Sequence, residues 1–282
     1  SVMALEAGDV DVIASVPNSD RANLLANNDV EWYETEGASI YILTFNTQEG
    51  IFAGQTLDDA GTKLRQAVSY AINRDDIILG ALEGIGEPLY ALMASFAFGY
   101  PDMSTFDIIE QDQEKAKELL EEAKIKDYNG DGLLEYPSGD SYRSFSLEFI
   151  VNKESPYKVA AAEYITESLR SLGFDIKLNI LSWSEYLLAL THGDFDMYYA
   201  EVGIGTDYNF APLLETDGTL NYGDLILTVY SNLVYDFLAA PDRESKLEAA
   251  EDLCKTIADN SPIIPIGYKT YAVMTHRNQI EN

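Results

Sequence analysis

Residues 64–78, LRQAVSYAINRDDII, carry the clearest structural signal in this chain. Their apolar side chains recur at i, i+3, i+4, i+7 and i+8, which places on one stripe of a helix Leu64, Ala67, Val68, Ala71 and Ile72. The polar residues Arg65, Ser69 and Asn73 fall elsewhere on the helical wheel. A second apolar turn, residues 77–79, runs into the glycine-rich sequence GALEGIGEP. The pattern predicts a helix packed on a core, followed by another helical turn and a loop.

Strand and helix patterns alternate before and after this helix. The first part of the chain predicts the end of a helix with Gly8 as its C-cap, a strand at 10–12, a short helix near 18–28, and strands near 30–35 and 38–46. Residues 84–110 are rich in glycine, proline and aromatic residues without a clear period, so they predict a long packed loop. Asp112 then caps a helix whose apolar face consists of Ala116, Leu119, Leu120 and Ala123.

The alternation resumes with the strand SFSLEFIVN, residues 144–152. Ser155 and Pro156 form an N-cap and first-turn pair for a helix that ends at Gly173. The series is completed by an alternating strand at 174–180, a helix near 184–191, a strand at 195–201 and a helix from about 243 to 259. This order predicts an α/β fold with a mostly parallel sheet flanked by helices. Ligands of such sheets bind beyond the carboxyl ends of the strands.

The composition excludes several classes of function. The 282 residues are 46% hydrophobic, which is enough for one large domain or two modest domains with a core. The 48 acidic residues outnumber 18 basic ones and give a net charge of -30, so a phosphate backbone would be repelled and no nucleic acid is expected as a partner. Cationic or amine-bearing partners are favoured. The sequence has no apolar run of the roughly 20 residues that a membrane span needs, and no basic, signal-like start.

Residues suited to catalysis are scarce. The single cysteine, Cys254, lies on the apolar stripe of a predicted helix and is expected to be a buried, inert thiol. The two histidines, His192 and His276, have no spacing that suggests a metal site or a catalytic triad. Gly203 and Gly205 follow a strand but lack the third glycine and the lysine of a phosphate loop. We expect a binding protein rather than an enzyme. A hydrolase derived from the same fold is the alternative, which a nucleophile and base in a cleft would support.

One stretch is similar to a calcium loop. DYNGDGLLE, residues 127–135, places Asp127, Asn129, Asp131 and Gly132 at positions 1, 3, 5 and 6 of such a loop. Ser138 stands at the twelfth position, where a bidentate glutamate is expected. Without that ligand a turn built from Asn-Gly and Asp-Gly is favoured. No metal is therefore expected, with Asp127, Asn129 and Asp131 as weak candidate ligands, and a calcium-dependent interaction module remains an alternative.

The segment 183–215 is the best candidate for solute binding. A predicted helix that presents Trp183 and Tyr186 leads into a strand, and this strand delivers the sequence GIGTDY, residues 203–208, at its carboxyl end. Close-approach glycines, one acid and several aromatic residues are typical of a pocket for a small organic solute with a charged end. With water excluded, the carboxylate of Asp207 would pair with a primary amine. Alternatively, Asp207-Tyr208-Asn209 is a capped turn that starts the next helical stretch.

Together these stretches resemble the extracellular solute-binding proteins of family 5, the peptide, dipeptide and nickel receptors of ABC importers. The family's order and spacing are matched by LRQAVSYAINRDDII with GIGEP, ALEAGDVDV, ASIYILTFNTQ, DQEKAKELLEEA with DYNGDG, WSEYLLALTHGDFDMYY and SPIIPIGY. In complete members these motifs occupy the second half of a longer chain. The resemblance therefore implies a fragment, mostly the C-terminal lobe of a periplasmic-binding-protein-like type II fold. It implies that 37–260 form the solute-binding lobe, and that 1–36 and 261–282 are hinge-crossing strands belonging partly to the missing lobe.

The resemblance also implies site residues. In peptide receptors of the family, an acid in an Asp-Tyr-Asn-x-Pro stretch holds the α-amino group of the ligand, and Asp207 matches that acid. Trp183 matches the tryptophan entering the preceding helix, and Asn221-Tyr222 resembles the Asn-Tyr found downstream. The sequence departs from the family at residues 203–205, which replace a tryptophan, and in DYNFAP, which has one extra residue before proline. The expected ligand contacts are Asp207, Tyr208, Trp183, Asn221, Tyr222 and Gly205.

The function that the resemblance implies is the extracellular capture of oligopeptides or dipeptides by closure of two lobes, for delivery to an ABC transporter permease. Nickel complexes and oligosaccharides are alternative solutes within the same class. The resemblance further implies a monomer that acts in the periplasm, or lipid-anchored on the extracellular face of the cell membrane, with signal and anchor outside this sequence. We expect no cofactor.

Overall fold

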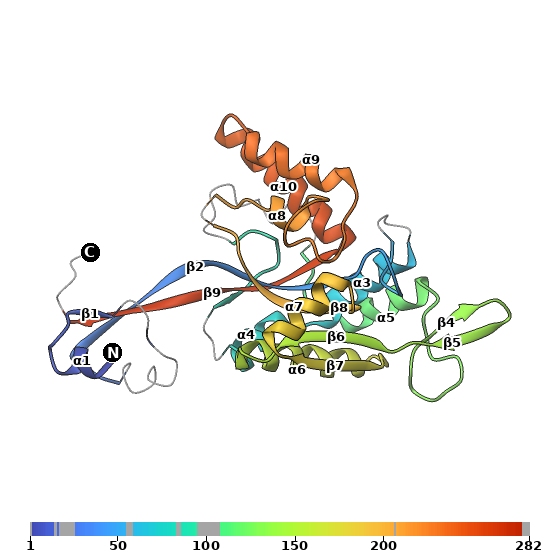
Figure 1. Cartoon of the computed structure of the whole chain (residues 1–282), viewed down its shortest axis with the longest axis horizontal. Coiled ribbons are helices and arrows are strands. Elements are labelled where there is room, and N and C mark those ends of the chain that lie inside the picture. The colour runs from blue at the N-terminus through green and yellow to red at the C-terminus, as the bar shows by residue number, and fades with distance from the viewer. Residues whose placement is uncertain are drawn as a thin grey trace.

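The computed structural model describes residues 2–13, 16, 26–54, 59–82, 86–94, 108–205 and 207–277. Its helices are α1 (Val2–Glu6), α3 (Ala60–Ala71), α4 (Arg74–Gly80), α5 (Gln113–Glu122), α6 (Pro156–Arg170), α7 (Trp183–His192), α8 (Ala211–Leu214), α9 (Thr228–Ala239) and α10 (Arg243–Asn260). Its strands are β1 (Val12–Ile13), β2 (Val30–Phe45), β3 (Glu87–Pro88), β4 (Glu135–Ser138), β5 (Ser141–Ser144), β6 (Leu147–Asn152), β7 (Ile176–Leu181), β8 (Met197–Gly203) and β9 (Ile263–His276). Figure 1 shows a body of helices around a sheet, from which β2 and β9 extend as a long arm towards β1 and α1.

The central sheet is mixed. Within the described residues its strand order is β1-β9-β2-β8-β6-β7, with β3 beside β9. Strand β6 pairs in parallel with β7 and β8, whereas the pairings of β2 and β9 are antiparallel. The prediction of a mostly parallel sheet is therefore wrong, although the α/β class with flanking helices is confirmed. Single crossover helices connect β6, β7 and β8 and make them parallel, but no such crossover sets the direction of β2 and β9.

Strand β2 is one continuous element where the sequence predicts two strands. It runs for 16 residues, and its register with β9 shifts between Glu36 and Ile40, where the prediction placed the break. Among the described pairings, β2 pairs with β9 alone up to Glu36 and also with β8 from Ser39 onward. The first half of β2 and the second half of β9 thus form the two-stranded arm seen in Figure 1. At its end, Leu5 and Met274 are buried in a small apolar cluster.

The helical signal of residues 64–78 resolves into two helices, α3 and α4. All five residues of the predicted apolar stripe are fully buried. Helix α3 ends at Ala71, and the side chain of Asn73 then accepts a hydrogen bond from the backbone N–H of Asp76 at 3.1 Å, which caps α4. Of the second apolar turn, Ile77 and Ile78 are buried in the core, whereas Leu79 points to solvent and is 72% exposed.

Both arginines of this motif are also buried, which the helical wheel does not predict. The guanidinium of Arg65 donates to the backbone oxygens of Phe52 at 2.5 Å, Gly54 at 2.8 Å and Asn260 at 3.0 Å. That of Arg74 donates to the oxygens of Pro265 and Ile109, both at 2.8 Å. Burial lowers the pKa of both guanidinium groups to about 10. The two arginines therefore connect α3 and α4 to the end of α10 and the start of β9.

The sheet separates two apolar layers. Helices α3 to α6 cover one face, where Tyr41, Phe149 and Tyr199 belong to a single buried cluster. The other face packs against α8, α9 and α10 through Ile40 and Ile42, and against α7 through Ile150 and Tyr198. Because side chains alternate along a strand, successive residues of β8 face opposite layers.

Most of the remaining sequence predictions hold where the structure describes the residues. Asp112 caps α5, Ser155 caps α6 with Pro156 in its first turn, and the helix predicted at 243–259 is α10. Much of the predicted helix 18–28 and of the predicted loop 84–110 lies outside the described residues. The hairpin of β4 and β5 and the helix α9 are not predicted from the sequence, because their short or two-sided apolar patterns lack a clear period.

Candidate binding site at the carboxyl end of β8

Local sequence signals build the helix and strand that lead to the candidate site. Ser182 and Glu185 form a capping box that starts α7, and Gly193, with φ 73°, ends it in the left-handed conformation. The hydroxyl of Tyr186 donates to the backbone oxygen of Tyr199 at 2.9 Å and holds α7 against β8. Strand β8 then ends at Gly203, on the edge of the sheet where β6 and β7 also have their carboxyl ends.

The turn after β8 presents one acid to solvent. Asp207 is exposed, and its carboxylate accepts the backbone N–H of Asn209 at 3.4 Å. Gly205 has φ 66°, and a Cβ there would lie 2.9 Å from the carboxylate of Asp207, so glycine suits this position. The side chain of Asn209 accepts the N–H of Ala211 at 3.0 Å, which makes an Asx turn ahead of α8, whose N-cap residue Phe210 forms no side-chain capping bond. The alternative reading of residues 207–209 is met in part, because they form a turn before α8 but do not cap it, and the exposed carboxylate of Asp207 stays a predicted ligand contact.

Tyr208 does not share this exposure. It has φ 54°, is 6% exposed, and its ring lies 6.3 Å from that of Phe210 in the layer of α8 to α10. The left-handed backbone turns the side chain inward while Asp207 stays outside. The buried ring of Tyr208 thus anchors the turn to the apolar layer beneath it.

Trp183 also lies at the carboxyl edge of the sheet. It is 54% exposed in the first turn of α7, and its ring centroid is 6.0 Å from that of Tyr186. Its backbone N–H donates to the carboxylate of Glu154, just beyond the end of β6, at 3.0 Å. The indole is therefore available on the same edge from which the Asp207 turn emerges.

Asn221 and Tyr222 lie at the opposite end of β8. The ring of Tyr222 is 6.4 Å from that of Tyr198, near the amino end of the strand, and a strand of this length spans about 20 Å. The amide of Asn221 bonds to Glu215 and Leu225 and closes its own loop. Both residues line a cavity of about 330 Å³ that includes His192. The structure therefore does not bring them together with Asp207.

The calcium-like loop is closed by its own hydrogen bonds. Both carboxylate oxygens of Asp127 accept backbone N–H groups, including that of Gly132 at 2.8 Å, and these bonds hold the pKa of the carboxyl below its usual range. Asn129 donates to Asp131 and to the buried Glu135. In the described parts of the chain, no group of three or more His, Cys, Asp or Glu side chains is placed to hold a metal ion.

The residues considered for catalysis lie apart. Cys254 is buried on α10, and burial raises the pKa of its thiol to about 12, so it is a poor nucleophile. His192 is exposed at the end of α7, with its Nδ1 3.7 Å from Asp194, and His276 ends β9 on the arm. The structure places these three residues on different elements.

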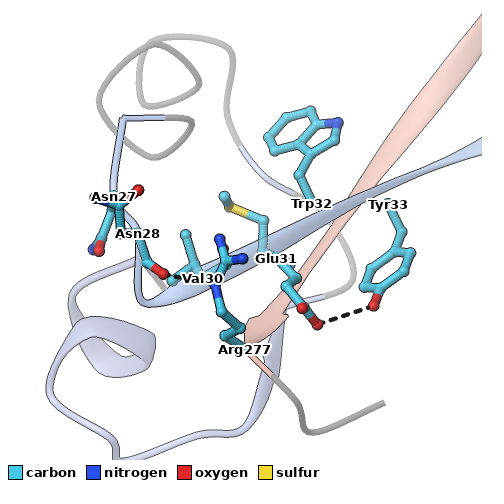
Figure 2. Close-up of a pocket in the computed structure, with 8 residues that line it drawn as sticks. Asn27, Asn28, Val30, Glu31, Trp32, Tyr33 and Arg277 are labelled. Atoms are coloured by element: carbon cyan, nitrogen blue, oxygen red, sulfur yellow. Dashed lines mark hydrogen bonds between the residues drawn. The ribbon is translucent and has the colours of Figure 1, made fainter. Parts of the chain in front are cut away.

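A further cavity, of about 380 Å³, lies at the end of the arm (Figure 2). Figure 2 shows Arg277 beside Val30 and Glu31, and its Nε donates to the backbone oxygen of Asn28 at 2.7 Å. The hydroxyl of Tyr33 donates to Glu31 at 3.0 Å. The first bond joins the residue after β9 to the residues before β2, and the second lies within β2. The cavity is remote from the carboxyl edge of β8.

Lys158 lies in the first turn of α6, at the carboxyl edge of the sheet, and is not among the residues predicted from the sequence. A signal was present, because a cation is unfavourable at the positive end of the helix dipole. The amphipathic pattern of α6 indicates only its buried residues.

The fold and this edge define a class of protein: an α/β protein with a mixed sheet, whose candidate ligand residues lie beyond the carboxyl ends of its parallel strands. The sequence profile of the family described as bacterial extracellular solute-binding proteins, family 5 Middle, matches residues 1–221. The chain belongs to this family.

Known relatives agree with this assignment. The oligopeptide-binding protein AppA of Bacillus subtilis is 25% identical over 267 residues, which cover 93% of this chain and 47% of that protein. The dipeptide-binding protein of Escherichia coli is 26% identical over 267 residues, covering 90% and 45%. The structure of Bacillus subtilis AppA with a nonapeptide aligns with TM-score 0.78 at 23% identity, over 99% of this chain and 55% of that one. This chain has the type II periplasmic-binding-protein fold and spans about half the length of the curated relatives it matches.

Proposed function

We propose that this chain is the solute-capturing lobe of an ABC importer's receptor, which binds oligopeptides or dipeptides outside the cell membrane by closing two lobes around them. Its membership of family 5 supports the receptor class, and the names of its relatives support a peptide. The observation that carries the proposal is an exposed carboxylate, Asp207, on the turn after β8 at the edge where α/β sheets bind ligands.

The division of the chain follows from the same proposal. Residues 37–260 form the lobe, and 1–36 with 261–282 supply strands that cross a hinge to a second lobe. The two-stranded arm supports this division, since β2 pairs with β8 only from Ser39 onward. A pair of long strands between two bodies provides a hinge that allows closure.

In the proposed site, Asp207 accepts the amine of the solute, and Trp183 offers an apolar surface beside it. Gly205 and Tyr208 set the conformation of the turn. Asn221 and Tyr222 stabilise the amino end of β8 and make no direct contact with the solute. Hydrogen bonds to charged groups contribute about 1.5–3 kcal/mol, so the amine contact would account for much of the affinity.

The remaining assignments belong to the proposal as well. The receptor delivers its solute to a membrane permease, acts as a monomer without catalysis, and lies in the periplasm or is lipid-anchored at the extracellular face. Among the residues that the structure describes, none of the helices combines the length and hydropathy that a bilayer crossing requires. Nickel complexes and oligosaccharides remain the alternative solutes.

Replacing Asp207 with asparagine in the complete receptor should weaken peptide binding by at least about 1.5 kcal/mol, because the amine loses its counter-charge while the shape of the turn is kept. Isothermal titration calorimetry with a short peptide would measure the change. The matched control is Asp140→Asn, at the exposed tip of the β4–β5 hairpin. An unchanged dissociation constant for Asp207→Asn would remove this residue from the site.

The isolated chain should bind the same peptide far more weakly than the complete receptor, since it provides one wall of the cleft. Closure of a second lobe excludes water and strengthens the charged contacts. Micromolar binding of di- to pentapeptides to the 282-residue chain alone, measured in the same calorimeter, would contradict the two-lobe mechanism.

A further inference from the structure

The cavity at the amino end of β8 is lined mainly by polar side chains. Its volume of about 330 Å³ is near the lower end of the range for small-molecule sites. Its walls come from the turn after β2, the end of α7 and the loop that carries Asn221 and Tyr222. Leu190 and the ring of Tyr222 supply its apolar surface, and the described residues that line it include no lysine or arginine. This composition suits a small polar solute.

Hydrogen bonds hold the walls of this cavity in place. The backbone N–H and the hydroxyl of the buried Thr47 both donate to the backbone oxygen of Gly223, at 3.0 and 2.9 Å. The Nε2 of Gln48 donates to the backbone oxygen of Asp224 at 3.0 Å. The amide of Asn221 closes the loop that follows α8. Because these bonds exist without a solute, the cavity is preorganised, which lowers the cost of binding.

Two hydrogen-bond donors on these walls lack an acceptor within the described part of the chain. The side-chain oxygen of Asn46 accepts the backbone N–H groups of Gln48 and Glu49, at 3.1 and 3.0 Å. The Nδ2 of Asn46 is therefore the unpaired end of the amide. It lies 3.9 Å from the position of a Cβ on Gly193, so a longer side chain there would cover it. The hydroxyl of Tyr222 also forms no hydrogen bond with a described residue.

Hydrogen-bond acceptors line the same cavity. Glu49 and Asp224 are exposed, and neither carboxylate has a hydrogen bond or ion pair with a described residue. These two negative charges would repel an anion. A cation would bind the carboxylates but leave both donors without an acceptor. A hydroxyl group donates and accepts at one atom, so a solute with several hydroxyl groups satisfies both kinds of partner.

We propose that this cavity is a second binding site, separate from the peptide cleft, for the ring of a neutral sugar. The carboxylates of Glu49 and Asp224 accept hydrogen bonds from hydroxyl groups of the ring. The Nδ2 of Asn46 and the hydroxyl of Tyr222 donate to other hydroxyl groups. Because the cavity and Asp207 lie at opposite ends of β8, about 20 Å apart, the sugar and the peptide bind independently.

The test is an NMR titration of the 282-residue chain with the methyl glycosides of glucose, galactose and mannose. At least one glycoside should bind with a millimolar or lower dissociation constant. Tyr222→Phe and Asp224→Asn each remove an acceptor or donor and keep the side-chain shape, so each should weaken binding at least about fivefold. Asparagine tolerates the φ of 57° at position 224. The matched controls are Tyr235→Phe on α9 and Asp140→Asn at the tip of the β4–β5 hairpin, both exposed, which should change the affinity by less than about twofold.

The inference is overturned if no glycoside binds, or if both variants bind as tightly as the wild type. Cyclohexylamine serves as a cationic probe. Tighter binding of this amine than of every glycoside, lost in Asp224→Asn, would show that the cavity takes a cation instead.

Thermal unfolding of both variants separates lost contacts from lost structure. The exposed side chain of Asp224 keeps the test decisive even if Tyr222→Phe is destabilised. In the complete receptor, glycoside binding that a saturating peptide abolishes would contradict a separate site. Peptide capture through Asp207 is tested independently, because neither variant alters the turn after β8.

Discussion

Replacing Arg65 with methionine should lower the free energy of unfolding of this chain by about 3 kcal/mol. The guanidinium is fully buried and donates to the backbone oxygens of Phe52, Gly54 and Asn260. Each buried acceptor that loses its donor costs about 1–3 kcal/mol, and relief of the desolvated charge offsets part of the sum. Lysine at this position should give an intermediate loss, since one ammonium cannot reproduce the fork of donors.

Equilibrium urea unfolding followed by circular dichroism would measure the loss as a lower midpoint at an unchanged slope. The control is Arg143→Met on β5, where the side chain is exposed and a change within about 0.5 kcal/mol is expected. A loss below about 1 kcal/mol for Arg65→Met would show that the carbonyl contacts contribute little to stability. Confirmation would explain the arginine of the LRQAVSYAINRDDII motif as a connection between α3 and the end of α10.

Truncation of Phe45 to alanine should destabilise the chain by about 3–5 kcal/mol. This residue ends β2, is fully buried, and its ring lies 4.6 Å from that of Phe52. In the sheet it stands opposite Met197, the first residue of β8. Removal of the ring leaves a cavity between β2, β8 and the loop before α3, and the surrounding backbone is held by sheet pairing that limits its collapse.

The same urea titration would measure this effect, with Tyr235→Ala as the control. Tyr235 is 68% exposed on α9, so loss of its ring should change stability by no more than about 0.5 kcal/mol. If Phe45→Ala cost less than about 1.5 kcal/mol, the cluster would be able to close around the missing ring, and the end of β2 would be more plastic than the structure indicates.

The parts of the structure that the sequence predicts well are those set by neighbouring residues. Asp112 and Ser155 accept the backbone N–H three residues ahead, and Asn73 does the same for α4. These caps depend on a few residues in a row, so they can be recognised without knowledge of the fold. The alternating strand that became β7 and the helix that became α10 belong to the same category.

The candidate site was predictable only in part. The position of Asp207 just beyond the carboxyl end of a strand follows from the local pattern and is confirmed, whereas the exposure of its side chain is seen only in the structure. The burial of Tyr208 depends on its left-handed backbone and on the layer beneath it. The position of Asn221 and Tyr222 depends on how the chain returns past Tyr198 to the other end of β8. A pattern of neighbouring residues cannot predict where the chain returns, because that position depends on long-range packing.

By itself the sequence determined the class of fold, the starts of its principal helices and the strand whose end carries Asp207, because propensity, capping and apolar periodicity act between residues close in the chain. Only the tertiary structure decided the antiparallel direction of β2 and β9, the burial of Arg65 and the separation of Asn221 and Tyr222 from Asp207. Those features depend on contacts between residues far apart in the sequence. Such contacts contribute to stability only after the layers have packed together.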